Sequence, residues 1–366
     1  LMDKNTFITK AVLRMYAENK LDLPWRNTRN PYKIWLSEII LQQTQVKQAL
    51  PYYDKITKAF PTLEHLAKAE ENDLLLLWQG LGYYSRARNM HAAARFIQHE
   101  LNGKFPQSYS ELLKLKGVGN YTAAAVASIA FEESVAAVDG NVIRILSRVF
   151  AVQEPVDKAF GKNIISNLAE KLVPKDNPGD FNQGMMDLGA TLCRKSNPDC
   201  LNCPLSEVCT AYAENMADRL PLKVNKQKKQ NRYIYYFIVR NVSNAGQALI
   251  LRKRSTSGIW KNMYDFPVLE YEKKPTLSAL PNDFSAQYGI SLKANQIIDT
   301  GSFRKHLLSH RNLFVKFYLL PLADEHFKAL LSADENFSET NFSDLNAFPF
   351  PEIINKFFKE EGKSLF

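Results

Sequence analysis

Two acidic residues, Glu38 and Asp139, lie in sequence contexts that could support chemistry. Glu38 sits in "IWLSEIILQ", and a carboxyl among apolar side chains has a raised pKa, which suits a general acid. Asp139 precedes Gly140 and Asn141 at the expected start of a helix, where an ionised carboxylate is stabilised. Such a pair of carboxyls can cleave a glycosidic bond. The plainer alternatives are an exposed Glu38 on an amphipathic helix and an Asp139 that only caps its helix.

The four cysteines of the chain lie together in "CRKSNPDCLNCPLSEVC", as Cys193, Cys200, Cys203 and Cys209. In a reducing compartment such a cluster is more typical of a metal site than of disulfides. Structural zinc usually takes two close cysteine pairs, whereas only Cys200 and Cys203 form one here. The spacing therefore favours an iron–sulfur cluster, and it leaves zinc and free thiols open.

The segment "LKGVGNYTAAAVASIAF" places Gly117 and Gly119 in a turn directly before an alanine-rich helix. Glycine allows positive φ and close approach of the backbone, and the start of the next helix offers free N–H groups to an anion. This pattern indicates a phosphate-binding hairpin. A plain helix–helix connection with glycine caps is the alternative.

These residues must be positioned by two different kinds of structure. From residue 4 to about 215 the apolar residues recur at helical spacing, and after about residue 232 strand-like alternation predominates. We expect a multidomain chain with an all-α region at 1–220, a basic linker at 221–232 and an α+β domain at 233–366. Helices are expected near 276–288 and 351–360.

Composition restricts the partners of the chain. Its 366 residues carry a formal net charge of +9, which favours a polyanion such as nucleic acid or an acidic membrane surface. The sequence has no long uncharged apolar run and no signal-peptide pattern at its start. We therefore expect a cytoplasmic protein, associated with the nucleoid if the source is bacterial, with no membrane partner.

Seven motifs together resemble the helix-hairpin-helix DNA glycosylase superfamily, and within it the adenine DNA glycosylases of the MutY type. They are "PWR", "SEIILQQTQV", "GLGYYSRARN", "LKGVGNYTAAA", "VDGNV", "FNQGMMDLGA" and the cysteine loop. The resemblance implies a 4Fe-4S cluster on the four cysteines and a cation at the helix-hairpin-helix. It also implies a monomer that acts on duplex DNA with adenine opposite 8-oxoguanine or guanine.

The resemblance assigns roles to individual residues. Glu38 would protonate adenine, Asp139 would stabilise the sugar cation, and Tyr121 and Asn141 would orient these groups. Tyr121 stands where strand-cleaving relatives of the endonuclease III type carry lysine, so a monofunctional enzyme that leaves an abasic site is expected. The expected adenine pocket consists of Trp25, Arg26 and Gln183, and the expected DNA contacts include Gln43, Thr44, Tyr83, Gly117 and Gly119.

The C-terminal part resembles the Nudix-like domain by which this family recognises 8-oxoguanine. The family's Phe-Ser-His triplet is matched by Leu308, Ser309 and His310, so the aromatic residue is replaced. The glutamate-bearing helix of Nudix hydrolases is missing, which favours lesion reading over nucleotide hydrolysis. Two rival hypotheses are a strand-nicking glycosylase for oxidised pyrimidines and a zinc-stapled DNA-binding protein.

Overall fold

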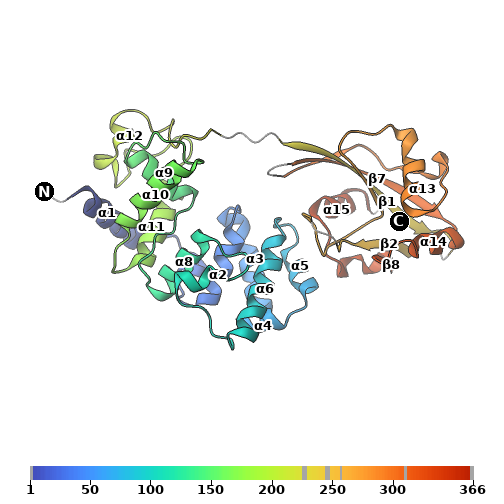
Figure 1. The fold of residues 1–366 in the computed structure, drawn as a ribbon, viewed down its shortest axis with the longest axis horizontal. Coiled ribbons are helices and arrows are strands. Elements are labelled where there is room, and N and C mark those ends of the chain that lie inside the picture. The colour runs from blue at the N-terminus through green and yellow to red at the C-terminus, as the bar shows by residue number, and fades with distance from the viewer. Residues whose placement is uncertain (1–2, 225–228, 244–247, 256–257, 309–310, 363–366) are drawn as a thin grey trace. The chain divides into compact units, whose positions relative to one another are not determined.

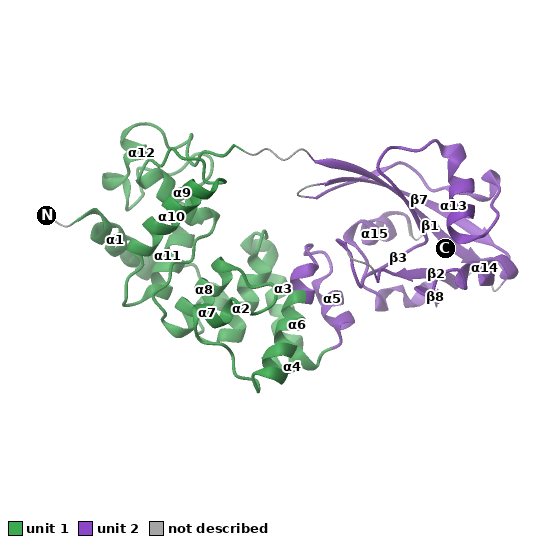
Figure 2. Cartoon of the chain, in the orientation of Figure 1, with its two compact units in different colours: residues 1–69, 89–226 green, residues 70–88, 227–366 purple. Residues whose placement is uncertain are grey.

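The computed structural model describes residues 3–224, 229–243, 248–255, 258–308 and 311–362. The chain divides into two compact units, Leu1–Ala69 with Asn89–Lys226 and Glu70–Arg88 with Gln227–Phe366 (Figure 2). The expected order, a helical region followed by a mixed α and β domain, is confirmed. The second unit also includes residues 70–88, a segment that the sequence did not set apart. The boundaries expected at 220 and 233 stay a prediction.

The first unit is built from helices joined by short loops (Figure 1). They are α1 (Lys4–Asn19), α2 (Pro31–Leu41), α3 (Val46–Ala59), α4 (Leu63–Lys68), α6 (Ser85–Glu100, which begins in the second unit), α7 (Tyr109–Leu112), α8 (Asn120–Phe131), α9 (Gly140–Val149), α10 (Ala159–Leu172), α11 (Pro178–Thr191) and α12 (Thr210–Ala213), with the 3-10 turns η1 (Pro24–Arg26) and η2 (Ser206–Val208).

Polar side chains cap several of these helices at their starts, where the first backbone N–H groups have no partner within the helix. Asp3, Asn30 and Asp139 each accept from a backbone N–H of the helix that follows. Ser108 and Glu111 form a capping box at α7. Caps of this kind set where each helix starts, and the cap of α9 is one of the two candidate catalytic residues.

Helix α11 forms the centre of the first unit, because it packs against α1, α8 and α9. It is buried from Phe181 to Gly189. A Cβ added at Gly184 would stand 2.8 Å from Val12 Cγ1, and one at Gly179 would stand 2.7 Å from Ser128 O. The glycines therefore let the backbone of α11 approach α1 and α8 closely.

The second unit contains a mixed sheet with helices around it. The strands are β1 (Gln230–Asn241), β2 (Ala248–Lys253), β3 (Tyr264–Asp265), β4 (Val268–Tyr271), β5 (Ile298–Asp299), β6 (Arg304–Leu307), β7 (Arg311–Leu322) and β8 (Phe337–Asn341), and the helices are α5 (Glu71–Trp78), α13 (Leu280–Tyr288), α14 (Asp324–Leu331) and α15 (Glu352–Phe357). The sheet has the order β3-β2-β1-β7-β5, with β4 paired to β1, β6 to β7 and β8 to β2. Strands β1 and β7 run parallel, and the other pairs are antiparallel.

Alternate residues of β1 point to opposite faces of this sheet, as the period of two requires. Phe237 packs with Phe284 of α13 and belongs to a core that includes Phe327 of α14. On the other face Tyr236 stacks on Phe317, which stacks on Phe357 of α15. Helices therefore cover both faces. The helices expected near 276–288 and 351–360 are confirmed, and α14 was missed.

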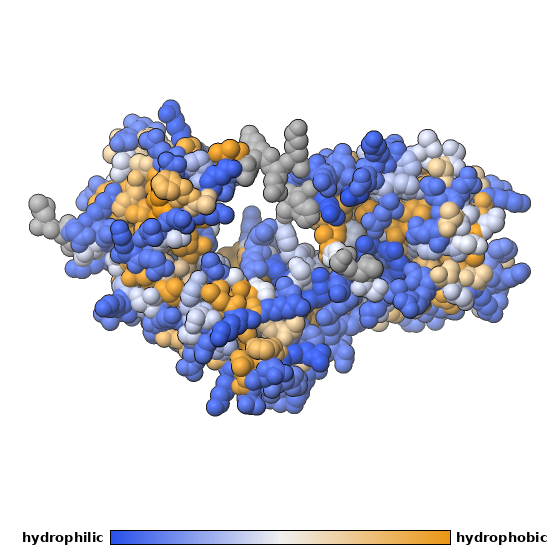
Figure 3. Space-filling model, in the orientation of Figure 1, coloured by the Kyte–Doolittle hydropathy of each residue, from blue (hydrophilic) through white to orange (hydrophobic). Residues whose placement is uncertain are grey.

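Polar residues cover most of the face shown in Figure 3, and the large apolar side chains that stay exposed include Phe160 and Leu201. Within the described residues, no helix has the length and apolar character needed to cross a membrane.

Candidate active site

Glu38 of α2 and Tyr121 of α8 form the closest polar pair of the candidate site. Tyr121 Oη donates a hydrogen bond of 2.6 Å to Glu38 Oε2. Glu38 is only 4% exposed, which excludes the alternative of a surface residue. Burial raises the pKa of Glu38, whereas the Tyr121 hydrogen bond and the positive charge of Arg26 oppose that rise. The raised pKa that the sequence predicted is thus confirmed, and it favours the protonated acid.

Asp139 is the N-cap of α9, as its sequence context predicted. Its Oδ1 accepts from Val142 N at 2.8 Å, and its Oδ2 accepts from Asn141 Nδ2 at 2.7 Å. Burial raises the pKa of Asp139 against these two hydrogen bonds. Asp139 also raises the pKa of Glu38 through its charge, so the two carboxyls lie near enough to influence each other. Capping and chemistry can therefore coincide in one residue.

Arg144 connects this carboxylate to the cysteine loop. Its Nη2 donates to Asn141 Oδ1 at 2.8 Å and to Gly189 O at 2.8 Å, and its Nε donates to Cys193 O at 2.7 Å. A Cβ on Gly189 would stand 2.4 Å from Asn141 Cβ, so α11 can hold this arrangement only with glycine there. Arg144 and Gly189 were not predicted from the sequence. Arg144 lies 45 residues from Gly189 and 49 residues from Cys193, and no local pattern links residues so far apart.

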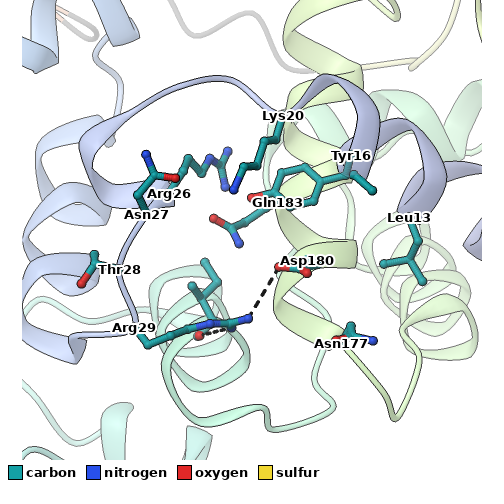
Figure 4. Close-up of a pocket in the computed structure, with 12 residues that line it drawn as sticks. Leu13, Tyr16, Lys20, Arg26, Asn27, Thr28, Arg29, Asn177, Asp180 and Gln183 are labelled. Carbon is teal, nitrogen blue, oxygen red and sulfur yellow. Dashed lines mark hydrogen bonds and ion pairs between the residues drawn. The ribbon is translucent and has the colours of Figure 1, made fainter.

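Arg26 and Gln183 line a pocket of about 570 Å³ in the first unit (Figure 4). Arg26 forms a buried ion pair of 2.8 Å with Asp187 of α11, which the sequence analysis also missed. The Gln183 amide points into the pocket in Figure 4, although the residue is only 3% exposed. Trp25 is placed differently: it is buried, and its ring packs edge-on against Tyr53 of α3.

Gln43 and Tyr83, the residues expected to wedge into the duplex, share an unusual backbone conformation. Both are exposed, and their φ angles are +55° and +49°. A left-handed conformation is costly for residues other than glycine and is often retained at functional sites. Thr44 follows Gln43 in the turn after α2, and its N–H donates to Leu41 O. Gln43 and Thr44 belong to the first unit and Tyr83 to the second.

The glycine hairpin joins α7 to α8. Gly117 has φ of +80°, and a Cβ there would stand 2.6 Å from Asn89 Cβ. Gly119 is the N-cap of α8, it supplies no side-chain cap, and a Cβ there would meet nothing within 4 Å. No side chain caps the first N–H groups of α8, and the space beside Gly119 is open, as an anion site requires. The cation expected at this hairpin stays a prediction.

The four cysteines line one pocket of the first unit together with the apolar side chains of Ile145, Val149, Leu188 and Leu205. Arg148 Nη1 lies 3.3 Å from Cys193 Sγ. Four thiols that converge on one apolar cavity, with a cation beside them, fit a group that takes four thiolate ligands. Among the described residues, no three His, Cys, Asp or Glu side chains are arranged to hold a single metal ion.

A second large pocket, of about 590 Å³, lies in the second unit. Tyr83, Trp260 and Leu308 line it, together with His306 and Arg311. Ser309 and His310, the residues expected to sense the lesion, lie outside the described residues. The described part of their loop therefore borders a cavity of the size that ligands occupy.

These features define a class of protein. The first unit combines a glycine hairpin, a cysteine loop and two neighbouring carboxyls. This combination is typical of a base-excision DNA glycosylase. Residues 36–175 match the model of the HhH-GPD superfamily base excision DNA repair protein, and residues 235–360 match the NUDIX domain. A solved thermostable thymine-DNA glycosylase is similar in structure, with a TM-score of 0.53 and 31% identity over 58% of this chain and 97% of that one.

Two curated relatives narrow this class. The adenine DNA glycosylase of Buchnera aphidicola subsp. Baizongia pistaciae is 36% identical over 84% of this chain and 84% of its own. The adenine DNA glycosylase of Mus musculus is 33% identical over 87% of this chain and 71% of its own. The chain belongs to the adenine DNA glycosylase family, and the resemblance found in the sequence is confirmed.

Proposed function

We propose that this DNA glycosylase hydrolyses the N-glycosidic bond of adenine paired with 8-oxoguanine or guanine in duplex DNA, and that it leaves an abasic site without cutting the strand. The observation that carries the proposal is the buried acid Glu38, hydrogen-bonded to Tyr121 and electrostatically coupled to Asp139. The flipped adenine would enter the space beside these three side chains.

Glu38 acts as the general acid. As the bond to the sugar breaks, its electron pair stays on adenine, and the proton of Glu38 neutralises the departing base. Burial raises the pKa of this carboxyl, so it holds a proton to give. Tyr121, whose pKa burial raises well above its usual value, remains a neutral donor that fixes the orientation of Glu38.

Asp139 stabilises the positive charge that develops on the sugar. Asn141 holds Oδ2 of the carboxylate, and the backbone of α9 holds Oδ1. Water then adds its hydroxyl to the sugar carbon and gives its remaining proton to the Glu38 carboxylate, which restores the acid. Each turnover consumes one water and releases adenine and an abasic site.

Tyr121 supports the monofunctional part of the proposal. A primary amine is needed to form an imine with the opened sugar and so to break the strand. At this position the phenol is instead engaged with Glu38, and it also lies 3.4 Å from the sulfur of Met186. No strand scission beyond spontaneous breakage is expected.

The 8-oxoguanine preference would reside in the second unit. Tyr83 and Leu308 line the same pocket there, next to the segment that holds Ser309 and His310. Helix α13 offers Asp283 as its only acid, and Tyr271 already donates to it. This helix lacks the carboxylates that Mg²⁺ needs for nucleotide hydrolysis, which supports a role in reading the lesion.

Cys193, Cys200, Cys203 and Cys209 would hold a 4Fe-4S cluster. The group would fold the cysteine loop around four metal–thiolate bonds, and Arg144 would fix that loop to α9 through Cys193 O. The purified protein should then be yellow-brown, whereas a zinc protein would be colourless. We also propose that the enzyme acts as a monomer.

The test uses duplexes with adenine opposite 8-oxoguanine, guanine or thymine, incubated with the protein and analysed with and without alkali. The proposal expects strand breaks only after alkali, and only with the first two duplexes. Breaks without alkali would instead favour the strand-nicking rival. Binding of duplex without any alkali-sensitive breaks would favour the non-enzymatic rival.

A further inference from the structure

The pocket of about 570 Å³ lined by Arg26 and Gln183 is distinct in its lining from the catalytic centre (Figure 4). Its lining includes neither Glu38 nor Tyr121 nor Asp139. It is lined instead by the C-terminal half of α1, the loop after η1 and the start of α11. Within the described residues, none of those proposed to contact duplex DNA lines it either. The pocket is therefore lined by other residues than those proposed to face the DNA.

Helix α11 connects this pocket to the catalytic centre. Gln183 points into the pocket, and Met186, three residues on, places its sulfur 3.4 Å from Tyr121 Oη. Residues three apart on a helix are neighbours, with Cβ atoms about 5–6 Å apart. Burial raises the pKa values of both Glu38 and Tyr121, and the positive charge of Arg26 opposes both rises. About one turn of α11 thus separates Gln183 from Met186, which contacts Tyr121, the hydrogen-bond partner of Glu38.

The lining of the pocket suits a neutral purine. Leu13, Tyr16 and Ile129 supply apolar and aromatic surface, and the Gln183 amide makes no hydrogen bond within the described part of the chain. A glutamine amide can donate and accept at once, which matches the paired donor and acceptor on the edge of adenine. The volume is within the range of small-molecule sites.

Charges at the rim are largely compensated. Arg29 pairs with Glu132 at 2.6 Å and with Asp180 at 3.8 Å, and it donates to Ile129 O at 2.6 Å. Lys20 adds one positive charge. This rim is partly exposed, so side-chain motion there can widen the opening. A neutral ligand would pass it without the desolvation cost of an ion.

Hydrolysis leaves the free base trapped if the abasic duplex stays in place. The duplex would cover the side on which Asp139 and Gln43 lie, and adenine is left between that duplex and α11. We propose that this pocket is the exit site through which the released base, an uncharged aminopurine, leaves past Gln183 and Arg26 while the DNA is still bound. The inference rests on the proposed adenine hydrolysis and adds a second opening to its base pocket.

The experiment blocks the opening with a bulky side chain at Ala17, an exposed position of α1 that lines the pocket. Enzyme in excess is mixed with a duplex whose adenine opposite 8-oxoguanine carries tritium. Alkali-sensitive breaks report bond cleavage, and passage of tritium through a membrane that retains protein reports release of the base. In Ala17→Trp, release should lag cleavage by about tenfold or more, as expected when product release becomes limiting.

Glu18→Trp is the matched control, since Glu18 is the next exposed residue of α1 and does not line the pocket. In Glu18→Trp, release of the base should keep pace with cleavage of the glycosidic bond, as in the unaltered protein. The inference is overturned if Ala17→Trp releases the base as fast as it cuts the bond, or if both variants lag equally. If Ala17→Trp does not fold, Lys20→Trp blocks the same rim and decides in the same way. Absence of cleavage by the unaltered protein would instead refute the proposed function.

Discussion

Tyr121 of α8 donates a hydrogen bond of 2.6 Å from its hydroxyl to Glu38 Oε2 of α2. This bond opposes burial, because it stabilises the ionised carboxylate while the apolar surroundings favour the protonated acid. The pKa of Glu38 is therefore raised, but less than burial alone would raise it. A catalytic acid benefits from such a balance, since it must hold a proton and also release it.

Replacing Tyr121 by phenylalanine should move the alkaline limb of the pH–rate profile to higher pH. The active form of Glu38 is protonated, so the rate is lost as pH rises through its pKa. Removing a hydrogen bond that lowers this pKa raises it further. Single-turnover rates of adenine release across the pH range would measure the shift.

Tyr32→Phe is the control for loss of a buried hydroxyl, because Tyr32 donates to Phe60 O at 2.7 Å outside the site. It should lower stability and leave the alkaline limb in place. An unchanged limb in Tyr121→Phe would mean that another group sets it.

Substitutions at the two carboxyls should separate catalysis from folding. Glu38→Gln removes the proton donor and should slow base release by about a hundredfold or more, while binding of the duplex survives. Asp139→Asn keeps a good capping residue, so the free energy of unfolding should change by less than about 1 kcal/mol. Asp139→Asn also removes the negative charge, so the rate of base release should fall although the protein stays folded. Thermal unfolding and single-turnover assays on the same preparations would compare the two. Ordinary turnover by either variant would end its proposed catalytic role.

Arg144 is proposed as a positioning residue for Asp139, through Asn141. Its charge lowers the pKa of Asp139, against the effect of burial. In Arg144→Met that pKa should rise, and because Asp139 must be ionised, the acid limb of the pH–rate profile should move to higher pH. A residue that acted only on stability would leave this limb unmoved. Arg14→Met, at an exposed position of α1, is the matched control.

The sequence contained the local part of this site. Apolar neighbours predicted the burial of Glu38, and the Asp-Gly-Asn stretch predicted the cap at Asp139; both depend on residues only a few positions away. The apolar stretches of β1 and β7 likewise predicted strands, and six consecutive residues of each are buried because helices cover both faces of the sheet. These features could be predicted because each is decided by side chains that are adjacent in sequence.

Contacts that depend on the approach of distant helices could not be predicted in this way. The Arg26–Asp187 pair joins residues 161 positions apart, and the Arg144–Gly189 bond requires α11 to lie against α9. The contact of the Trp25 ring with Tyr53 is also of this kind, and the expected place of Trp25 at the adenine pocket stays a prediction. Segment 70–88 joins the second unit through contacts such as Arg88 to Lys261 O, which no local pattern reveals.

The two hairpin glycines should respond differently to alanine. Gly117 has φ of +80° and Asn89 close by, so Gly117→Ala should lower the free energy of unfolding by about 1–2 kcal/mol. Gly119→Ala meets open space, and its stability should hardly change. Its added methyl would nevertheless stand beside the free N–H groups of α8, and duplex binding should weaken because a phosphate could approach less closely. Chemical denaturation and binding titrations would test both variants. If Gly119→Ala bound duplex as tightly as the unaltered protein, the hairpin would be a connection between helices rather than a phosphate site.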